Sequence, residues 1–361
     1  MFNNAYSDRK VLITGHTGFK GSWLALWLKA LGAKVFGISL APHTVPSHWD
    51  LLNVDMESAY IDIRDQTVLH SKLLAIKPEI IFHLAAQPLV RQSYVDPLET
   101  WSINVMGTAN VLNSCRTLEG LAGVVVITTD KCYENKEWEW GYREIDPLGG
   151  HDPYSASKAG SELVAASFRK SFFDTSASPL IATTRAGNVI GGGDWSKDRL
   201  IPDLVRSIDT GDVLKIRYPN ATRPWQHVLE CLSGYLLVGQ RMLEGDASMA
   251  TAWNFGPGAE GNKEVHDVLD ALQRHQLDVN WSPEAAQQMH EAKLLQLDSG
   301  RARQHLGWSP VWSFDEGIKA TAEWYFNWQK SGLVLSVNQL DEYVKQAKHL
   351  QHPWAQHQNA T

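Results

Sequence analysis

Short apolar runs alternate with helical patterns over the first half of the chain. The runs are rich in β-branched residues and too short for helices, which is typical of strands buried in a parallel sheet. After the first run, Trp23 and Trp27 stand four positions apart on one face of residues 21–31, with leucines beside them, and this predicts an amphipathic helix. Four such runs predict strands: residues 10–14 (KVLIT), 34–39 (KVFGIS), 80–84 (IIFHL) and 124–128 (VVVIT).

Helical patterns follow the third and fourth runs, and then the alternation ends. Residues 104–115 and 154–170 predict two further helices. The repeated strand–helix–strand order predicts an α/β protein with a doubly wound parallel sheet, whose site lies at the carboxyl ends of the strands. After about residue 186, glycine-rich GGGDW (191–195) and several prolines break the chain into shorter pieces. We therefore expect a second lobe that covers the site.

Composition and charge narrow the class of protein. Apolar residues make up 43% of the chain and charged residues 20%, which is typical of a globular protein with a substantial core. No stretch approaches the roughly 18–20 apolar residues of a membrane span, and the chain passes at once into a strand-like run, so we expect a cytoplasmic protein without a membrane partner. A net charge of −7 without a long basic run argues against nucleic acid as a partner.

Cysteine and histidine spacing predicts neither disulfides nor a metal site. The three cysteines, Cys115, Cys132 and Cys231, lie far apart and form no CxxC pair, so we expect buried, apolar thiols. The 14 histidines show no HExxH or comparable spacing, so we expect no metal.

A glycine-rich turn follows the first predicted strand and precedes the Trp23/Trp27 helix. Glycines at 15, 18 and 21 (GHTGFKG) allow a tight turn and close backbone approach, and the helix N-terminus offers free N–H groups to a pyrophosphate. The spacing GxxGxxG differs from the usual GxGxxG, and an ordinary strand-to-helix turn is the alternative. Its position favours dinucleotide binding.

The second predicted strand lacks the acid that usually follows it in dinucleotide-binding folds. An Asp or Glu for the ribose is expected about 20 residues after the glycines, but Ser39-Leu40 leads into APHTVPSHW with no acid before Asp50. Residues 35–63 also contain no Lys or Arg for a 2′-phosphate, which favours NAD over NADP. Asp62 either faces the adenine or caps the next helix.

Tyr154 and Lys158 lie four apart in YSASK, on one face of the predicted helix. A lysine cation near a phenol favours the phenolate and lowers the tyrosine pKa toward working pH. Such a tyrosine can remove a hydroxyl proton while hydride leaves the same carbon. An inert surface pair is the alternative.

The combination of TGHTGFKG, HLAAQ (83–87), TTD (128–130) and YSASK resembles the extended short-chain dehydrogenase/reductase family over residues 8–330. The resemblance implies a Rossmann-type fold with a smaller C-terminal substrate-binding lobe. It also implies NAD as cofactor, with Thr129 as catalytic hydroxyl, Tyr154 as base and Lys158 as its helper. Asp130 directly after Thr129 is similar to the sugar-nucleotide 4,6-dehydratases, which usually continue with Glu where this chain has Lys131.

The resemblance also implies a domain division and a subunit arrangement. Residues 1–186 are expected to form the NAD-binding domain, to which segments around 227–250 and 312–335 return. Residues 187–226 and 251–311 are expected to form the sugar-nucleotide lobe, and residues 348–361 a polar tail. Members commonly pair through the helices that correspond to residues 104–115 and 154–170, which implies a homodimer or a dimer of dimers.

Four longer sequence motifs narrow the resemblance to the branch of these dehydratases that acts on CDP-D-glucose. In that branch a lysine is expected at the position of Lys131. The resemblance implies net loss of water: Tyr154 takes the O4 proton as hydride leaves C4, and Asp130, kept protonated by burial, protonates the departing C6 hydroxyl. Lys131 is either the C5 base or a charged stabiliser of the enolate with water or Tyr154 as base; an exposed loop lysine is the third possibility. The product would feed dideoxyhexoses of bacterial surface polysaccharide. The motifs are LAAQPLVRQSY (84–94), TTDKCYEN (128–135), RAGNVIGGGDW (185–195) and RPWQH (223–227).

The resemblance assigns binding residues to both ligands. Planar arginines suit a diphosphate because they offer bidentate contacts, although a solvated surface role is the default for any one of them. The substrate residues implied are Gln87, Asn188, Arg199, Arg223 and, more weakly, Arg301. The cofactor residues implied are Gly15, Thr17, Gly18, Phe19, Lys20, Asp62, Ile63, Leu84, Ala85, Ala86, Thr128, Tyr154 and Lys158.

Other conspicuous residues are expected to be structural, and rival functions remain. His83 and His227 are expected in the core or a pocket wall, and most of the 15 tryptophans in the core, so no tryptophan is assigned to the site. A sugar-nucleotide 4-epimerase also uses Tyr and Lys with recycled NAD, but needs no acid such as Asp130. A reductase that consumes NADPH and a non-catalytic dinucleotide sensor are the remaining alternatives.

Overall fold

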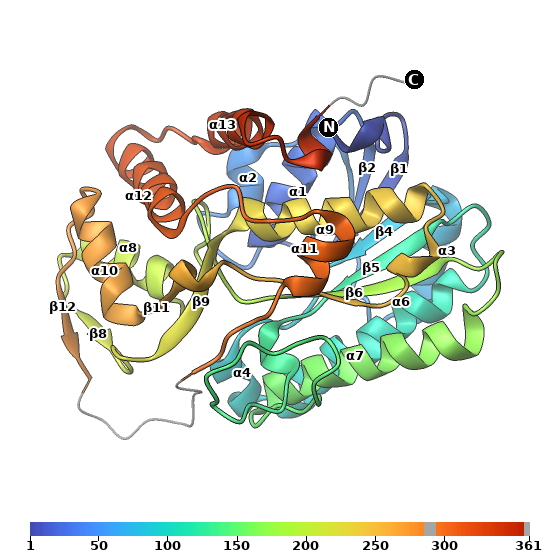
Figure 1. Cartoon of the computed structure of the whole chain (residues 1–361), viewed down its shortest axis with the longest axis horizontal. Coiled ribbons are helices and arrows are strands. Elements are labelled where there is room, and N and C mark those ends of the chain that lie inside the picture. The colour runs from blue at the N-terminus through green and yellow to red at the C-terminus, as the bar shows by residue number, and fades with distance from the viewer. Residues whose placement is uncertain (285–293, 357–361) are drawn as a thin grey trace.

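A seven-stranded parallel sheet forms the centre of the molecule (Figure 1). The computed structural model describes residues 1–284 and 294–356. The strand order is β10-β6-β5-β4-β1-β2-β3, and every neighbouring pair is parallel. The order in which the strands are added therefore reverses between β1 and β4. An open α/β sheet binds its ligands at such a switch point. Its strands are β1 (Lys10–Thr14), β2 (Lys34–Ser39), β3 (Glu57–Tyr60), β4 (Ile80–His83), β5 (Gly123–Ile127), β6 (Leu180–Ala186) and β10 (Ala252–Phe255).

Helices cover both faces of this sheet because successive strand residues point to opposite sides. Val11 and Ile13 of β1 belong to a core shared with α1 and α9, whereas Leu12 belongs to a core shared with α3 and α6. Figure 1 shows α6 and α7 on one side of the sheet and α1, α9 and α13 on the other. These helices are α1 (Phe19–Ala30), α3 (Gln66–Ile76), α6 (Gly107–Cys115), α7 (Pro153–Phe172), α9 (Val228–Leu243) and α13 (Ser336–His349).

Helix α7, which carries the YSASK motif, has a well-defined start. Asp152 is its N-cap and accepts a hydrogen bond from Ser155 N at 2.9 Å, and Pro153 occupies the first turn, where its missing N–H costs nothing. The segment before α6 is helical earlier than expected, because a π-helical turn (Ser102–Met106) leads into it. The large domain also has three short helices. Helix α2 (His48–Leu52) follows β2, and α4 (Val90–Val95) and α5 (Pro97–Trp101) precede the π-helical turn.

The smaller lobe has its own sheets and core. One sheet has the order β11-β9-β7, and a second pairs β8 with β12. Its apolar core includes Trp195, Trp225 and Trp324. The elements are β7 (Asn188–Ile190), β8 (Leu214–Ile216), β9 (Thr222–His227), β11 (Asn262–Glu264), β12 (Trp281–Pro283), α8 (Leu200–Thr210), α10 (Val265–Arg274) and α12 (Phe314–Ser331). Helix α11 (Gly300–Leu306) packs instead on β10 and α9, and its buried residues belong to the core of the large sheet.

The fold class expected from the sequence is confirmed, and the four predicted strands match β1, β2, β4 and β5 to within one residue at either end. Some segments do not follow the expected division into an NAD-binding domain and a lobe. β10 joins the large sheet beside β6, although residues 251–311 were assigned to the lobe, and α12 packs on β9 and α10 of the lobe. Within that range, residues 285–293 lie outside the described residues.

The end of the chain does not form a free polar tail over its described part. Trp354 is 1% exposed and stacks on Phe2 with ring centroids 5.0 Å apart, which ties the C-terminal segment to the N-terminus. This corrects the expectation for residues 348–356; residues 357–361 lie outside the described residues. The apolar contact of Trp354 was hidden because the surrounding segment is rich in Gln and His.

The cysteines and most of the tryptophans are buried, as expected. Cys115, Cys132 and Cys231 are free and buried, and Trp23 and Trp27 are completely enclosed. Among the residues that the structure describes, no helix is both long and apolar enough to cross a membrane.

Candidate active site

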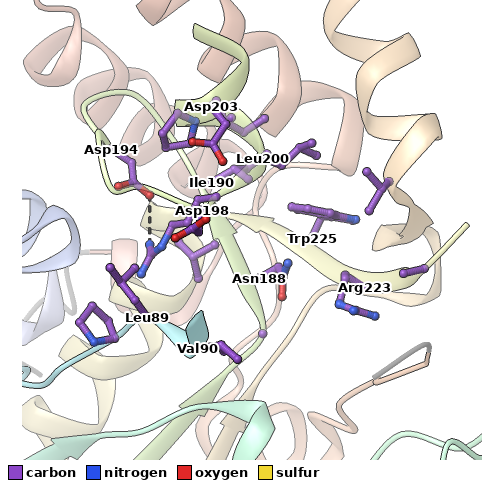
Figure 2. Close-up of a pocket in the computed structure, with 18 of the residues that line it drawn as sticks. Leu89, Val90, Asn188, Ile190, Asp194, Asp198, Leu200, Asp203, Arg223 and Trp225 are labelled. Carbon is purple, nitrogen blue, oxygen red and sulfur yellow. Dashed lines mark hydrogen bonds and ion pairs between the residues drawn. The ribbon is translucent and has the colours of Figure 1, made fainter. Parts of the chain in front are cut away.

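Two adjoining cavities open at the carboxyl edge of the large sheet. The smaller, of about 250 Å³, lies along the glycine turn. The larger, of about 750 Å³, lies between the sheet and the smaller lobe (Figure 2). They share Lys20, Pro88, Thr128, Tyr154 and Arg199 in their walls, so a ligand in one cavity would touch a ligand in the other along these side chains.

The glycine turn fits a dinucleotide. Gly15 has φ +79°, and a Cβ there would lie 2.7 Å from the backbone nitrogen of Ala85. A Cβ at Gly21 would lie 2.1 Å from the carbonyl oxygen of Gly15, so neither position accepts a side chain. Helix α1 begins here with Gly18 as N-cap, no capping side chain and no acid in its first turn. Its free N–H groups and positive dipole end therefore suit a pyrophosphate.

All thirteen residues expected to hold the cofactor line the smaller cavity. They come from the turn before α1, from the segment after β3 and from the ends of β4 and β5, together with α7. Sequence-distant words thus meet because parallel strands present their carboxyl ends at one edge.

Hydroxyl groups stand where an acid was expected after β2. Ser39 ends β2, lines the smaller cavity, and its Oγ lies 2.7 Å from Thr17 Oγ1. Thr17 Oγ1 also donates to the carbonyl oxygen of Leu40 at 2.9 Å, and His43 lines the same end of the cavity. This end therefore offers a ribose neutral donors and acceptors.

Asp62 lines the cavity but does not cap a helix. Its carboxylate accepts hydrogen bonds from the Arg64 guanidinium at 2.6 and 2.9 Å, and this contact lowers the Asp62 pKa. The N-cap of α3 is Asp65, which accepts from Val68 N at 3.1 Å. The capping alternative for Asp62 is therefore wrong.

Tyr154 lines both cavities and Lys158 lines the smaller one, and both side chains are buried. Burial raises the pKa of Tyr154 to about 12, opposed by the positive charge of Arg199 and a hydrogen bond with Thr129. Burial and the nearby cation of Lys20 lower the pKa of Lys158 to about 8, and its Nζ donates to Ile127 O at 3.3 Å. The sequence led us to expect a lowered tyrosine pKa beside Lys158, but here desolvation of the phenolate outweighs the neighbouring charges.

Asp130 is a buried acid beside Tyr154. It begins a short 3₁₀ helix (Asp130–Cys132) whose N-cap is Thr129, it is 1% exposed, and its Oδ1 accepts from Thr129 Oγ1 at 2.9 Å. Its Oδ2 has no hydrogen-bond partner among the described residues. Burial raises its pKa, opposed first by the Lys131 cation. This favours the protonated form that donation of a proton requires.

Lys131 lies in the wall of the larger cavity and is partly buried. It stands next to Asp130 in the same 3₁₀ helix. The position is compatible with either of its two expected chemical roles.

Three of the five expected substrate residues line the larger cavity. Asn188 and Arg223 lie on the adjacent strands β7 and β9, as Figure 2 shows. Arg199 precedes α8, and Asp194 Oδ2 holds its Nη1 at 3.0 Å.

Gln87 and Arg301 do not reach either cavity wall. The Gln87 amide donates to Leu89 O and Thr100 Oγ1, both at 3.0 Å, and so shapes the loop after β4 from inside. Arg301 donates to Ala252 O at 3.1 Å and to Thr251 Oγ1 at 3.2 Å, on the side of β10. Neither side chain lines either cavity here, and the assignment of Gln87 and Arg301 to the substrate stays a prediction.

Sequence reasoning missed residues of the larger cavity that the second lobe supplies. Trp225 is part of its wall, contrary to the expectation that no tryptophan belongs to the site. The signal for it was the word RPWQH itself, since Arg223 and Trp225 point to the same side of β9. Lys215 and Arg217 add further cations from β8 and the residue after it.

The histidines expected to be structural are buried as predicted. His83 lies 2.7 Å from Thr14 Oγ1 and 3.1 Å from Thr108 Oγ1, and burial, with the charge of Lys158, lowers its pKa to about 3. Burial likewise lowers the pKa of His227 to about 3. Both are neutral core side chains at ordinary pH.

Comparison with known proteins gives a consistent family. The model of the GDP-mannose 4,6 dehydratase family matches residues 12–321 of the chain. A CDP-glucose 4,6-dehydratase of Salmonella typhimurium is 46% identical over 350 residues, which cover 94% of this chain and 98% of that protein. A dTDP-glucose 4,6-dehydratase of Streptomyces venezuelae, solved with NAD bound, has a TM-score of 0.74 at 27% identity over 88% of this chain and 97% of that one. An epimerase of Methanothermobacter thermautotrophicus has a TM-score of 0.79 at 24% identity over 91% and 96%, a likeness of fold alone.

Proposed function

Because the chain belongs to the GDP-mannose 4,6 dehydratase family, we propose that it is an NAD-dependent lyase that converts CDP-D-glucose to CDP-4-dehydro-6-deoxy-D-glucose and water. One observation carries the proposal: Asp130, a buried acid, lies beside Tyr154 at the junction of a dinucleotide-shaped cavity and a larger one. The 46% identity to the Salmonella enzyme supports the choice of CDP-D-glucose.

Each catalytic residue carries out a different proton transfer in the proposed reaction. NAD held along the glycine turn would accept hydride from C4 of the hexose and return it to C6. Tyr154 takes the proton of the C4 hydroxyl, and the Arg199 cation and a hydrogen bond with Thr129 offset the cost of a buried phenolate. Asp130 gives its proton to the C6 oxygen, which leaves as water once the C4 ketone has made the C5 proton acidic.

Lys131 faces the same cavity, and we propose that it acts at C5. As the C5 base, neutral Lys131 takes the proton and gives it back to C5 when hydride reaches C6; as a cation it stabilises the enolate, and water or Tyr154 takes and returns the proton. The two roles differ in the charge that Lys131 must carry, so Lys131→Arg distinguishes them. An arginine cannot act as a base near neutral pH, but it preserves a stabilising charge.

Arg199, Arg223 and Asn188 are proposed to hold the diphosphate and its sugar. Lys215 and Arg217 are further positive side chains in the wall of the larger cavity. This local positive charge suits an anionic substrate despite the net charge of −7 for the whole chain.

A 4-epimerase is the nearest alternative. It requires Tyr154 and Lys158 but no acid at C6, so a buried Asp130 whose pKa is raised favours the dehydratase. A dinucleotide sensor would not need a phenol in the wall shared by the two cavities, with an ammonium group in one cavity and a carboxyl group in the other.

We also propose a cytoplasmic homodimer. Free cysteines suit a reducing compartment. Val95, Leu98, Trp101, Met106 and Leu163 are exposed apolar side chains on α4, α5, the turn before α6, and α7, and we call them the α5–α7 patch. The exposed fractions of Leu98 and Leu163 are 80% and 61%, and exposed apolar side chains on neighbouring helices favour a contact surface there. A second copy that pairs the same helices would cover it.

Purified protein incubated with CDP-D-glucose, dTDP-D-glucose and UDP-D-glucose and catalytic NAD tests the proposal. We expect the CDP sugar alone to lose one water, by mass, and to give the ketone absorbance in alkali. A 4-epimer without loss of water would establish the epimerase instead. Conversion of another sugar nucleotide would contradict the substrate but not the reaction.

A further inference from the structure

A buried ion pair lies directly beneath the proposed catalytic residues. Glu162 of α7 and Arg185 of β6 contact each other through two hydrogen bonds, Nε to Oε1 at 2.9 Å and Nη2 to Oε2 at 2.8 Å. Both side chains are 3% exposed, and neither lines a cavity. Because 154, 158 and 162 are spaced by four, Glu162 continues the helix face that carries Tyr154 and Lys158.

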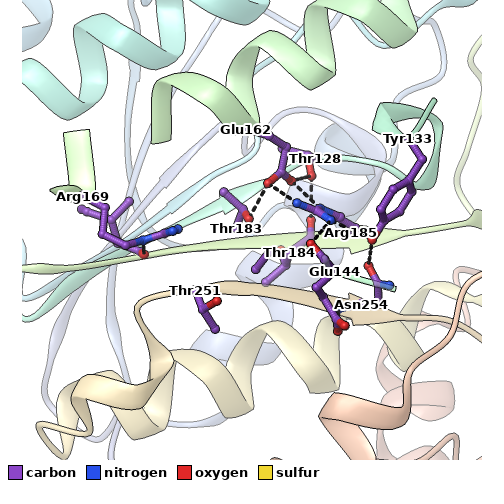
Figure 3. Close-up of polar contacts among 12 residues, drawn as sticks. Thr128, Tyr133, Glu144, Glu162, Arg169, Thr183, Thr184, Arg185, Thr251 and Asn254 are labelled. Carbon is purple, nitrogen blue, oxygen red and sulfur yellow. Dashed lines mark hydrogen bonds and ion pairs between the residues drawn. The ribbon is translucent and has the colours of Figure 1, made fainter. Parts of the chain in front are cut away.

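The Glu162 carboxylate also holds the start of the catalytic segment, residues 128–133. Its Oε1 accepts from Thr128 Oγ1 at 2.5 Å, and its Oε2 accepts from Thr183 Oγ1 at 2.7 Å (Figure 3). Lys158 reinforces this hold, since its Nζ donates to the carbonyl oxygen of Ile127, the residue before Thr128.

Arg185 holds the other end of the same segment. Its Nη1 donates to the hydroxyl of Tyr133 at 2.7 Å and to Glu144 O at 3.3 Å. Tyr133 in turn donates to Asn254 Oδ1 at 2.8 Å, which anchors it to β10. Figure 3 shows these contacts as one connected group between α7, β6 and β10.

Thr129, Asp130 and Lys131 thus lie between two anchored ends. A buried ion pair is a poor source of stability, because desolvation of both charges offsets their attraction, and apolar replacements are often tolerated. Its contribution here is geometric: a bidentate contact fixes both distance and orientation.

We propose that the Glu162–Arg185 pair is a positioning pair of the proposed dehydratase, which holds both ends of the catalytic segment against α7 so that Asp130 and Lys131 keep a fixed place relative to Tyr154 and Lys158. The role rests on the proposed function for its chemistry. The geometry itself does not depend on which sugar nucleotide is the substrate.

The charge of Glu162 also acts on Lys158. The groups that influence Lys158 are Lys20 of α1, Glu162 of its own helix and Cys132 of the segment, while His83 of β4 is neutral. Glu162 raises the Lys158 pKa against burial and Lys20. Loss of that charge favours neutral Lys158 and moves the alkaline limb of the activity profile to lower pH.

The test compares Glu162→Gln with Glu230→Gln. Glu230 is a second fully buried carboxylate, bonded to two backbone N–H groups and a tyrosine hydroxyl, and it lines neither cavity. We expect Glu162→Gln to lower kcat about 30- to 100-fold with KM within about threefold, since misplacement by 1 Å can cost about 100-fold. Its alkaline limb should move to lower pH, whereas Glu230→Gln keeps the kcat and pH profile of the wild type. Equal kcat and pH profiles in both variants would overturn the proposal.

Two further measurements keep the result decisive. Glu162→Leu/Arg185→Met leaves no unpaired charge, so it serves where the single variant fails to fold; wild-type kcat in the double variant overturns the proposal. Crystal structures of wild type and Glu162→Gln report the segment directly, and we expect residues 128–133 to shift by about 1 Å, the displacement that costs such a rate. An unmoved segment contradicts the positioning role, while absence of turnover in the wild type contradicts only the proposed function.

Discussion

Burial shifts the pKa values of the titratable side chains that line the two cavities. The pKa of Asp130 is raised, that of Tyr154 is raised to about 12 and that of Lys158 is lowered to about 8, in each case chiefly by desolvation of the charged form. The neutral forms of Asp130 and Tyr154 are therefore favoured, which suits an acid at C6 but places a demand on the base, whereas Lys158, with a pKa of about 8, is still mostly a cation near neutral pH. Arg199 and Thr129 ease that demand because both favour the phenolate.

Asp130→Asn tests the acid. The amide keeps the size of the side chain but cannot give a proton to the leaving C6 oxygen, so we expect kcat to fall about 100-fold or more. KM for CDP-D-glucose and the thermal midpoint should change little. In the wild type, kcat should decline as the pH rises past the elevated pKa of Asp130, because only the protonated acid donates. A variant that keeps more than a third of kcat would exclude this role.

Ser39→Asp tests how the cofactor ribose is held. A carboxylate at the end of β2 can accept from both ribose hydroxyls, and hydrogen bonds to charged groups contribute about 1.5–3 kcal/mol. We expect the Kd for NAD, measured by quenching of tryptophan fluorescence, to fall about tenfold, and that for NADP to rise because the carboxylate repels a 2′-phosphate. Ser39→Asn, of similar size without charge, should give no gain. Tighter NADP binding in the aspartate variant would contradict this account.

Short sequence motifs predict which segments of the chain meet at the site. They predict less well which side chains of those segments point into a cavity. Every expected cofactor residue lines the smaller cavity, because glycine turns and strand ends offer few alternatives. Gln87 and Arg301 lie in equally distinctive motifs, yet both turn toward backbone carbonyls. Their directions depend on tertiary partners, Thr100 and Ala252, which no local pattern identifies.

The turn between β1 and α1 is the element most sensitive to a single methyl group. Gly21→Ala would place a Cβ 2.1 Å from Gly15 O, so either the turn or the helix must move. We expect a loss of about 1–3 kcal/mol in the free energy of unfolding and at least about tenfold weaker NAD binding, because the N–H groups of α1 lose their alignment.

Gly120→Ala is the matched control for that change. Gly120 has φ +76° and open space around its Cβ position, so the substitution costs about 1 kcal/mol of backbone strain without crowding. Denaturant unfolding and NAD titration separate the two effects: Gly120→Ala should lose stability alone. Unchanged NAD affinity in Gly21→Ala would show that the turn tolerates displacement.

Three strands of the large sheet, β3, β6 and β10, lie outside the four predicted runs, and β6 and β10 escaped the apolar pattern for a shared physical reason. β6 (LIATTRA) contains Thr183 and Arg185, and β10 (AWNF) contains Asn254. All three polar side chains are buried, and each is satisfied by the hydrogen bonds that surround Glu162 and Tyr133. A search for apolar runs misses a strand whose polar residues find partners inside the fold.

The stability of the whole molecule should depend on pH through Glu230. This residue of α9 accepts from the backbone N–H groups of Val311 and Trp312 and from Tyr343 of α13, and burial raises its pKa to about 7. Its unfolded value is about 4.3. The folded protein therefore holds the extra proton between these values, so the stability it contributes is present at low pH and is lost as the pH rises to about 7.

Unfolding by urea at pH 5 and pH 7.5 measures this contribution. We expect the wild type to lose about 2–3 kcal/mol more than Glu230→Gln over this interval, because the amide mimics the protonated acid and does not titrate. The same slope in both proteins would assign the pH dependence to other groups.

Assembly should depend on the α5–α7 patch. Leu163 lies on α7 one residue after the inward face of Tyr154, Lys158 and Glu162, and it is 61% exposed. A carboxylate there would be desolvated on pairing without a partner, which costs several kcal/mol per ion. Leu163→Glu should therefore convert a dimer to a monomer in sedimentation, with the thermal midpoint of the subunit little changed. Leu333→Glu is the control, at a leucine that is 51% exposed outside the patch, and it should remain dimeric. An intact Leu163→Glu dimer would place the interface on another face of the subunit. Because α7 also carries Tyr154, loss of activity on dissociation would link assembly to the site.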